Sequence, residues 1–305
     1  MKATNDIRYL KRQDIDTHRW DACIEKASNS LIYGLHFYLD HMADSQWDAL
    51  VLDDYKAVMP LPWRKKFGIT YTYQPPFTQQ LGIFTTTQTT GFTEAFLNQL
   101  PAHFRFAEIF LNHANTTPTA KAHINYILPL DAPYDQLAAR YKKDLVRNLK
   151  LAATADLSYQ KDYPLAPALD GYRREYAPRT PHLKEKDFRN FGQLCTWMQQ
   201  RRQLLIRAVT GKDQQPLATA LLFRDDRRLY LLQSTTPQRG RENKANHFLL
   251  DMLVREWADS GLTLDFEGSD IPGIAHFYEN FGGRNQPYFF YRHNSLSWPV
   301  RLIKG

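Results

Sequence analysis

The sequence predicts a mixed α/β (α+β) protein of two domains, each a mostly antiparallel sheet flanked by helices. Three observations support this class: strand-like segments joined by short turns, helices with one apolar face, and a similar order of elements in both halves of the chain. The second half shows the pattern most clearly, in the order strand 204–210, strand 217–223, strand 229–233, helix 243–259, strand 262–267, helix 272–281 and strand 287–292.

The first half repeats this order in a weaker form. Its expected elements are helical segments within 19–43, a hairpin at 48–63, a β-prone segment at 67–73, a helix near 92–100 and strands near 104–111 and 122–130. No residue-level repeat accompanies the shared order. We therefore interpret the first half as a diverged structural duplicate of the second.

A long helix is expected between the halves, from Tyr134 to Ala155, because apolar residues recur there at i, i+4 spacing. The opposite face of this helix is basic and includes Lys143, Arg147 and Lys150. Such a stripe suits the phosphates of a nucleotide-linked acceptor or of tRNA, and the alternative is a solvated helix face.

The composition narrows the class of protein and of ligand. The chain has 305 residues, 43% of them hydrophobic, and carries 39 basic against 32 acidic residues, for a net charge of +7. This excess suits an anionic ligand such as CoA, a nucleotide-sugar or tRNA. Cys23 and Cys195 lie far apart without a further ligand at metal-binding spacing, so neither a disulfide framework nor a metal site is expected. We expect a cytoplasmic protein without a transmembrane segment, since no run approaches the roughly 18 apolar residues that span a bilayer.

The segment 264–283 is the most informative part of the chain. It combines a strand, a tight turn rich in Gly, Ser, Asp and Pro, a short helix with an apolar stripe, and a glycine stop. The run Ile274-Ala275-His276-Phe277-Tyr278-Glu279-Asn280-Phe281-Gly282 resembles the last motif of the GNAT acyltransferase superfamily. The Leu-Asp-Phe-Glu-Gly-Ser sequence that starts at Leu264 is similar to the corresponding segment in the Fem-type branch of this superfamily. That branch includes the peptidoglycan cross-bridge aminoacyltransferases. The resemblance covers roughly residues 135–295 well and the first 130 only in topology.

The resemblance implies two tandem GNAT-like domains at 1–133 and 134–295, with a tail at 296–305 packing back on the first domain. It also implies transfer of an acyl or aminoacyl group to an amine by direct attack. The donor would be an acyl-CoA or an aminoacyl-tRNA, without a metal, and the acceptor a small molecule or a peptidoglycan-precursor-like amine. The Gln/Arg-x-x-Gly-x-Gly/Ala donor loop is absent in strict form at 238–245. The alternative is therefore a binding or scaffold protein that has lost its donor site, and a tRNA- or RNA-binding module is a third possibility.

The loop 234–246 is the predicted donor site, because a helix start offers unpaired N–H groups to a phosphate. Asn243 is expected to cap the helix, and Gly240 to let the backbone approach the ligand. The alternative is an ordinary solvated loop. The predicted donor-binding residues are Gln238, Arg239, Gly240, Arg241, Asn243 and Lys244.

Two residues are candidates for the chemistry itself. The resemblance implies that the hydroxyl of Tyr278 protonates the leaving group, and the alternative is packing beside Phe277 and Phe281. Asp265 and Glu267 are expected on one face of the strand, where Glu267 could deprotonate the attacking amine or instead cap the next helix.

The segment 71–82 is rich in aromatic, amide and proline residues and is the predicted acceptor-binding segment, through Tyr73 and Gln79. Planar rings and neutral hydrogen-bonding groups suit a sugar or a peptide. A packed loop between domains is the alternative.

Overall fold

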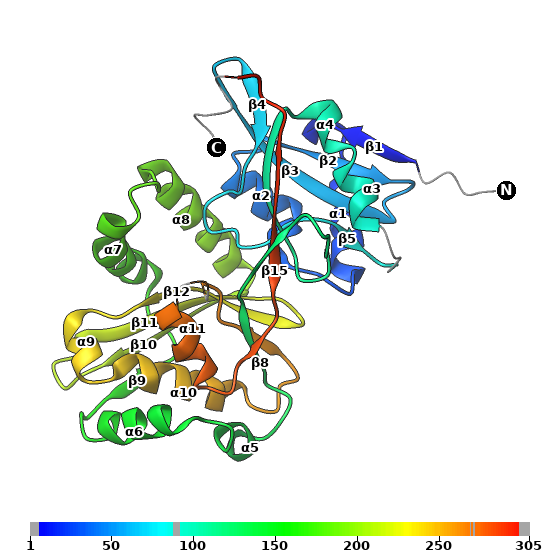
Figure 1. Cartoon of the computed structure of the whole chain (residues 1–305). Coiled ribbons are helices and arrows are strands. Elements are labelled where there is room, and N and C mark those ends of the chain that lie inside the picture. The colour runs from blue at the N-terminus through cyan, green and yellow to red at the C-terminus, as the bar shows by residue number, and fades with distance from the viewer. Residues whose placement is uncertain (1–5, 88–91, 269, 271, 299–305) are drawn as a thin grey trace. The chain divides into compact units, whose positions relative to one another are not determined.

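The computed structural model describes residues 6–87, 92–268, 270 and 272–298. The chain forms two compact units (Figure 1): unit 1 holds the residues up to His123 and those from Pro287 onward, and unit 2 holds Ile124–Gln286. These limits differ from the predicted division at 133/134 and 295. Residues 299–305 of the predicted tail lie outside the described part of the chain.

Unit 1 is built on an eight-stranded sheet in the order β1-β2-β3-β4-β6-β15-β7, with β5 paired to β3. The strands are β1 (Ile7–Leu10), β2 (Trp47–Leu52), β3 (Ala57–Lys66), β4 (Ile69–Thr72), β5 (Phe84–Thr85), β6 (Phe106–Leu111), β7 (Lys121–His123) and β15 (Tyr288–Asn294). The helices are α1 (Thr17–Lys26), α2 (His36–Met42), α3 (Phe92–Leu97) and α4 (Leu100–His103). The expected helix near 92–100 is thus two short helices, and a proline stands in the first turn of the second.

Unit 2 contains a seven-stranded sheet in the order β14-β8-β13-β12-β11-β10-β9. The strands are β8 (Tyr126–Pro129), β9 (Ser158–Gln160), β10 (Leu204–Thr210), β11 (Pro216–Arg224), β12 (Arg228–Thr235), β13 (Thr263–Asp265) and β14 (Arg284–Asn285). The helices are α5 (Tyr134–Ala138), α6 (Lys143–Ala152), α7 (Leu165–Tyr176), α8 (Glu185–Gln200), α9 (Gln238–Glu242), α10 (Ala245–Trp257) and α11 (Pro272–Glu279). Among the described strands of this sheet, only the pairing of β12 with β13 is parallel. The predicted mixed, mostly antiparallel α/β class is confirmed.

Helices cover both faces of the unit 2 sheet, with α7 and α8 on one side and α6 and α10 on the other (Figure 1). The alternation of side chains along β11 explains this arrangement. Ala220 and Leu222 join the buried cluster that contains Leu249 of α10. The neighbouring Phe223 stacks on Phe191 of α8, with ring centroids 6.0 Å apart. A strand buried on both faces fits the nearly continuous apolar run of its sequence.

Two predicted elements differ from the structure, and two helices are additional to those predicted. The helix expected at 134–155 is broken between α5 and α6, where Lys142 is extended and its N–H donates to the carbonyl of Asn280 at 2.9 Å. Helices α7 and α8 were not predicted. Strand β15 belongs to unit 1, because it pairs with β6 from Phe289 to Asn294.

Candidate functional site

The candidate site in unit 2 lies where the parallel strands β12 and β13 diverge. Strands β12 and β13 are paired only from Arg228↔Thr263 to Tyr230↔Asp265. Strand β12 then continues to Thr235 along β11, with an irregularity that leaves Leu232 between two registers. No strand in the described part of unit 2 pairs with residues 231–235 on the β13 side. The divergence therefore opens a slot beside the part of β12 that has no neighbouring strand on this side.

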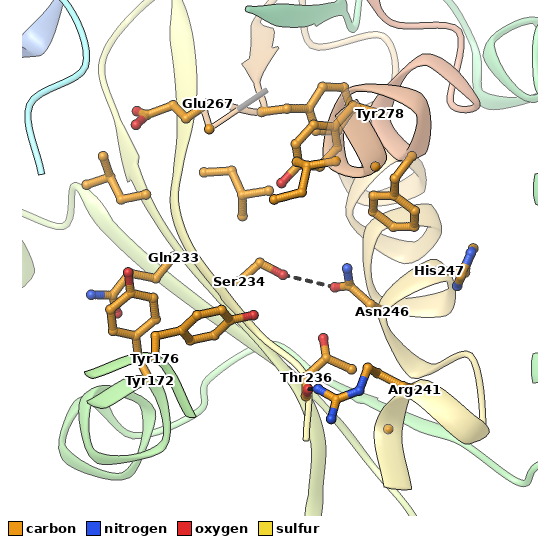
Figure 2. Close-up of a pocket in the computed structure, with 18 of the residues that line it drawn as sticks. Tyr172, Tyr176, Gln233, Ser234, Thr236, Arg241, Asn246, His247, Glu267 and Tyr278 are labelled. Atoms are coloured by element: carbon orange, nitrogen blue, oxygen red, sulfur yellow. Dashed lines mark hydrogen bonds between the residues drawn. The ribbon is translucent and has the colours of Figure 1, made fainter. Parts of the chain in front are cut away.

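A cavity of about 650 Å³ fills this slot (Figure 2). Its walls come from residues 231–234 of β12, Thr236 after that strand, the α9–α10 junction, residues 266–268 after β13, helix α11, and α7. One end is basic and lies at the start of α10, and the other carries the two predicted catalytic residues. A concave, largely apolar site with a few convergent polar groups is typical of ligand-binding pockets.

The basic end contains Arg241 and Lys244. The Arg241 Nη1 donates to the main-chain carbonyl of Thr236 at 2.6 Å, which fixes its guanidinium beside the end of β12. Lys244 precedes α10 in the left-handed conformation, with φ of 55°. Because a helix start carries partial positive charge, these two cations and the start of α10 together favour an anionic group.

The structure separates the six predicted donor-binding residues. Gly240, Arg241 and Lys244 line the cavity. Outside the lining, Arg239 pairs with exposed Asp213 at 2.9 Å, and Gln238 donates to Glu242 at 3.1 Å. The side chain of Asn243 donates to the carbonyl of Arg239 at 2.7 Å, so Asn243 ends α9 and does not cap α10.

Gly240 has a packing role that the sequence did not indicate. A Cβ at this position would lie 1.7 Å from the carbonyl oxygen of Leu217 in β11. The glycine is therefore required for α9 to approach the sheet. Close approach of the backbone to a ligand, as predicted from the sequence, is not needed to explain it.

Tyr278 lies at the other end of the cavity, on α11. Its ring stacks on Phe266 with centroids 4.4 Å apart, and Figure 2 shows its hydroxyl directed into the cavity. Burial raises the pKa of Tyr278, and the nearby Tyr176, Glu267 and Asp265 raise it further. The phenol therefore keeps its proton at neutral pH and can donate it.

Glu267 also lines the cavity, just past the end of β13. It adopts a left-handed conformation with φ of 50°, and its N–H donates to Oδ1 of Asp265 at 3.2 Å. Burial raises the pKa of its carboxyl to about 8. A carboxyl with such a pKa exchanges a proton near neutral pH, as a general base requires.

Asp265 does not share the cavity with Glu267, which corrects the expectation that both acids lie on one face. It is fully buried and is held by Arg228 Nη1 at 2.5 Å and by Asn125 Nδ2 at 2.9 Å. The left-handed turn at Glu267 interrupts the strand alternation on which that expectation rested. Asp265 therefore supports the turn from inside the sheet.

Several lining residues were not among the predicted site residues. Tyr172 and Tyr176 of α7 stack with centroids 4.9 Å apart, and their i, i+4 spacing was the available signal. Ser234 donates to Asn246 at 3.0 Å across the cavity (Figure 2). Burial, followed by the charge of Lys244, lowers the pKa of His247 to about 4, so its imidazole is neutral.

The predicted acceptor-binding residues lie elsewhere. Tyr73 and Gln79 belong to unit 1, where the guanidinium of Arg64 lies 4.0 Å from the Tyr73 ring centroid and Gln80 donates to Gln79 at 2.7 Å. The basic stripe of α6 is exposed, outside the cavity lining of unit 2: Lys143, Arg147 and Lys150.

The described residues offer neither a metal-binding cluster nor a membrane-spanning helix. No group of three or more His, Cys, Asp or Glu side chains among them could hold a metal ion. No helix formed by those residues is both long and apolar enough to cross a bilayer.

Comparison with known proteins agrees with this geometry. Residues 139–277 match the family model of the acetyltransferase (GNAT) domain, so the resemblance predicted from the sequence is confirmed for this part of unit 2. No curated protein matches the sequence.

Solved structures resemble the whole chain. The structure of FemX is similar with a TM-score of 0.65 at 12% identity, covering 97% of this chain and 99% of that one. A conserved protein of unknown function from Bacteroides thetaiotaomicron has a TM-score of 0.56 at 10% identity, with 94% and 99% coverage. L-PGS from Bacillus licheniformis has a TM-score of 0.53 at 8% identity, with 94% and 95% coverage. At these identities the likeness concerns the fold, and it confirms the predicted arrangement of two tandem GNAT-like domains.

Proposed function

We propose that this protein transfers an acyl or aminoacyl group from a phosphate-bearing activated donor to an amine, and that the unit 2 cavity is its active site. One observation carries the proposal: a single cavity joins a basic helix start, an unpaired strand edge, a buried tyrosine hydroxyl and a carboxyl with a raised pKa. These features can serve phosphate binding, stabilisation of the carbonyl oxygen, and acid and base catalysis in acyl transfer.

The donor's phosphates would lie against Arg241, Lys244 and the start of α10. Its acyl carbonyl would then lie beside the edge of β12, where main-chain N–H groups can stabilise negative charge on the carbonyl oxygen. Both a CoA thioester and the 3′ end of an aminoacyl-tRNA present phosphates at one end and a reactive acyl group at the other. These remain the two donor classes.

The reaction would proceed in a ternary complex without an acyl-enzyme intermediate. The amine attacks the acyl carbon and forms a C–N bond, while its proton passes to the Glu267 carboxylate directly or through water. Collapse of the tetrahedral intermediate breaks the bond to the thiolate or to the ribose oxygen, which takes the proton of Tyr278. Solvent then restores both protonation states.

Transfer itself is the first test. The protein is incubated with CoA thioesters or with aminoacyl-tRNA and a panel of amines that includes peptidoglycan-precursor-like peptides. Release of the donor's leaving group and a mass increase on one amine are expected. If neither donor is turned over and neither shifts the melting temperature, the proposal fails.

The second candidate function is a scaffold that keeps the fold and has lost the donor site. The packing role of Gly240 and the absence of the strict glycine pattern at 238–245 favour it. Such a protein would bind neither donor and would copurify with a protein partner.

We also propose that the exposed basic stripe of α6 contacts an anionic acceptor or tRNA. The stripe consists of Lys143, Arg147 and Lys150.

Removing the positive charge of Arg241 should weaken donor binding. Arg241→Gln keeps a donor for the Thr236 carbonyl, and we expect a loss of about 1.5–3 kcal/mol, as for a hydrogen bond to a charged group. The measurement is calorimetric titration with the donor. Arg239→Gln is the matched control, because Arg239 is paired with Asp213 outside the cavity. Equal losses in the two variants would show that only the overall charge matters.

The pH dependence of kcat/KM should follow the ionisation of the Glu267 carboxyl. Since only its carboxylate accepts a proton, kcat/KM is expected to rise by about tenfold per pH unit below the pKa of Glu267 and to level off above it. That pKa is raised to about 8, which places the bend there. Glu267→Gln should abolish this limb of the profile. The control Glu279→Gln alters an exposed acid of α11 that pairs with Lys142 at 2.7 Å, and it should keep the limb. If kcat/KM of Glu267→Gln still rises with pH in this range, another group is the base.

A further inference from the structure

The turn between β3 and β4 in unit 1 presents an aromatic side chain to solvent. Phe67 is 91% exposed, the highest value among the large apolar residues of the described chain. It occupies the first position of a two-residue turn, followed by Gly68, and both residues have positive φ, of 51° and 78°.

Phenylalanine is unfavourable here for two separate reasons. The left-handed conformation strains a residue with a bulky side chain, and turns of this kind are usually formed by Asn-Gly or Asp-Gly. Exposure of the ring adds the cost of hydrating a large apolar surface. Neither cost serves the fold, because an asparagine would form the turn better. The ring itself therefore requires an explanation.

All the charged residues of the segment that carries the turn are basic. Lys65 and Lys66 precede Phe67 and are exposed, and the Lys66 ammonium lies 5.3 Å from the Phe67 ring centroid. The sequence contains no Asp or Glu between Asp54 and Glu94. An exposed aromatic ring next to two lysines is complementary to a surface whose outer layer is anionic and whose interior is apolar.

A second exposed aromatic residue emerges at the same end of the sheet. Trp298 is 78% exposed. Tyr71 of β4 and Asn294 of β15 both pair with Phe106 of β6, the first in parallel and the second antiparallel. The chain before Tyr71 and the chain after Asn294 therefore leave the sheet at the same end of its strands, as Figure 1 shows at the top of unit 1.

We propose that this end of the unit 1 sheet, formed by the β3–β4 turn and the segment after β15, docks on an anionic lipid surface. Phe67 and Trp298 enter the interfacial region, where aromatic side chains are favoured, and the lysines contact lipid phosphates. Attachment of this kind is peripheral and reversible, and it needs no membrane-spanning helix. The proposal does not depend on the transferase function.

Vesicle flotation tests the proposal with the full-length protein. Vesicles of equal parts phosphatidylglycerol and phosphatidylcholine should carry the protein upward, and vesicles of pure phosphatidylcholine should not. Binding should weaken as salt is raised, because the attraction to the anionic surface is screened. Failure to bind the anionic vesicles at low salt would overturn the proposal.

Three variants locate the contact. Phe67→Asn suits the turn and should therefore keep or raise the melting temperature, while partitioning falls by roughly tenfold or more. Lys65→Glu combined with Lys66→Glu should reduce partitioning by about tenfold or more, because each basic residue near the surface contributes to the attraction. The control is Lys143→Glu combined with Lys150→Glu on α6, which changes the net charge equally and should retain binding.

Two results would contradict the assignment. Equal losses in the α6 control and the turn variants would mean that net charge alone drives binding. A dimer in analytical ultracentrifugation that Phe67→Asn dissociates, without vesicle binding by the parent protein, would assign the exposed aromatic ring to a second copy of the chain.

Discussion

Replacing Tyr278 with phenylalanine should lower kcat for acyl transfer by roughly 10²–10⁴-fold, the usual contribution of a positioned general acid. The substitution removes only the hydroxyl. The ring keeps its stacking on Phe266, so folding and donor affinity should survive. Single-turnover kinetics at saturating donor separate the chemical step from binding.

Tyr176→Phe is the matched control for this experiment. Tyr176 lines the same cavity and is stacked on Tyr172, so the variant loses a hydroxyl there as well. A packing role for Tyr278 predicts that Tyr278→Phe is nearly silent and that Tyr278→Ala chiefly lowers the melting temperature. If Tyr278→Phe keeps its rate within about threefold, well below the expected loss, the leaving group takes its proton from another source.

Replacing Arg228 with methionine should destabilise the fold by about 3–5 kcal/mol, because it leaves a buried carboxylate without its partner. The Asp265 side chain is 0% exposed and that of Arg228 only 11%. Asp265 also accepts the Glu267 N–H, so the turn at Glu267 should loosen together with the sheet. Denaturant unfolding of the purified variant measures the loss in free energy.

Two comparisons make this stability prediction specific. Arg239→Met breaks the exposed pair with Asp213 and should leave the unfolding midpoint nearly unchanged. Replacing both members of the buried pair, with Arg228→Met and Asp265→Leu, should recover part of the lost stability, since no uncompensated charge is left. An Arg228→Met protein as stable as the parent would contradict the stabilising role of this buried pair.

The sequence predicted most of the unit 2 sheet because strong local signals mark its strands. Apolar runs at β10, β11 and β12 are each bounded by turn residues. Helix α7 escaped prediction because Pro167 and Gly171 are poor helix formers and because its one buried residue is the small Ala168. Helix α8 buries Asp187 and Asn190 along with its apolar residues, which hides the expected stripe.

Tertiary contacts account for the errors in length and assignment. No local signal marks the break at Lys142, since its cause is a hydrogen bond to Asn280, far along the chain. Similarly, nothing within β15 indicates that its partner is β6, a strand of the first half. Such long-range pairings set the limits of the two units, and periodicity alone does not contain them.

The same distinction holds for the candidate site. Tyr278 and Glu267 were identified because they lie within one contiguous motif, and both line the cavity. Arg239 and Arg241 are equivalent by charge and by position in the loop. Only the structure shows that Asp213 holds one of them and that the other lines the cavity. The stacked tyrosines of α7 come from a distant segment, so their place in the wall depends on packing.

Hydrogen exchange of the intact protein with and without donor tests the central claim most directly, because it reports where the donor binds independently of the chemistry. The unit 2 cavity predicts that a CoA thioester or an aminoacyl-tRNA, whichever the protein turns over, will protect segments 231–247 and 272–278. The Arg241→Gln variant should lose this protection, and Arg239→Gln should keep it. Protection confined to unit 1, or no change in these segments with a donor that is being turned over, would contradict the assignment of the active site.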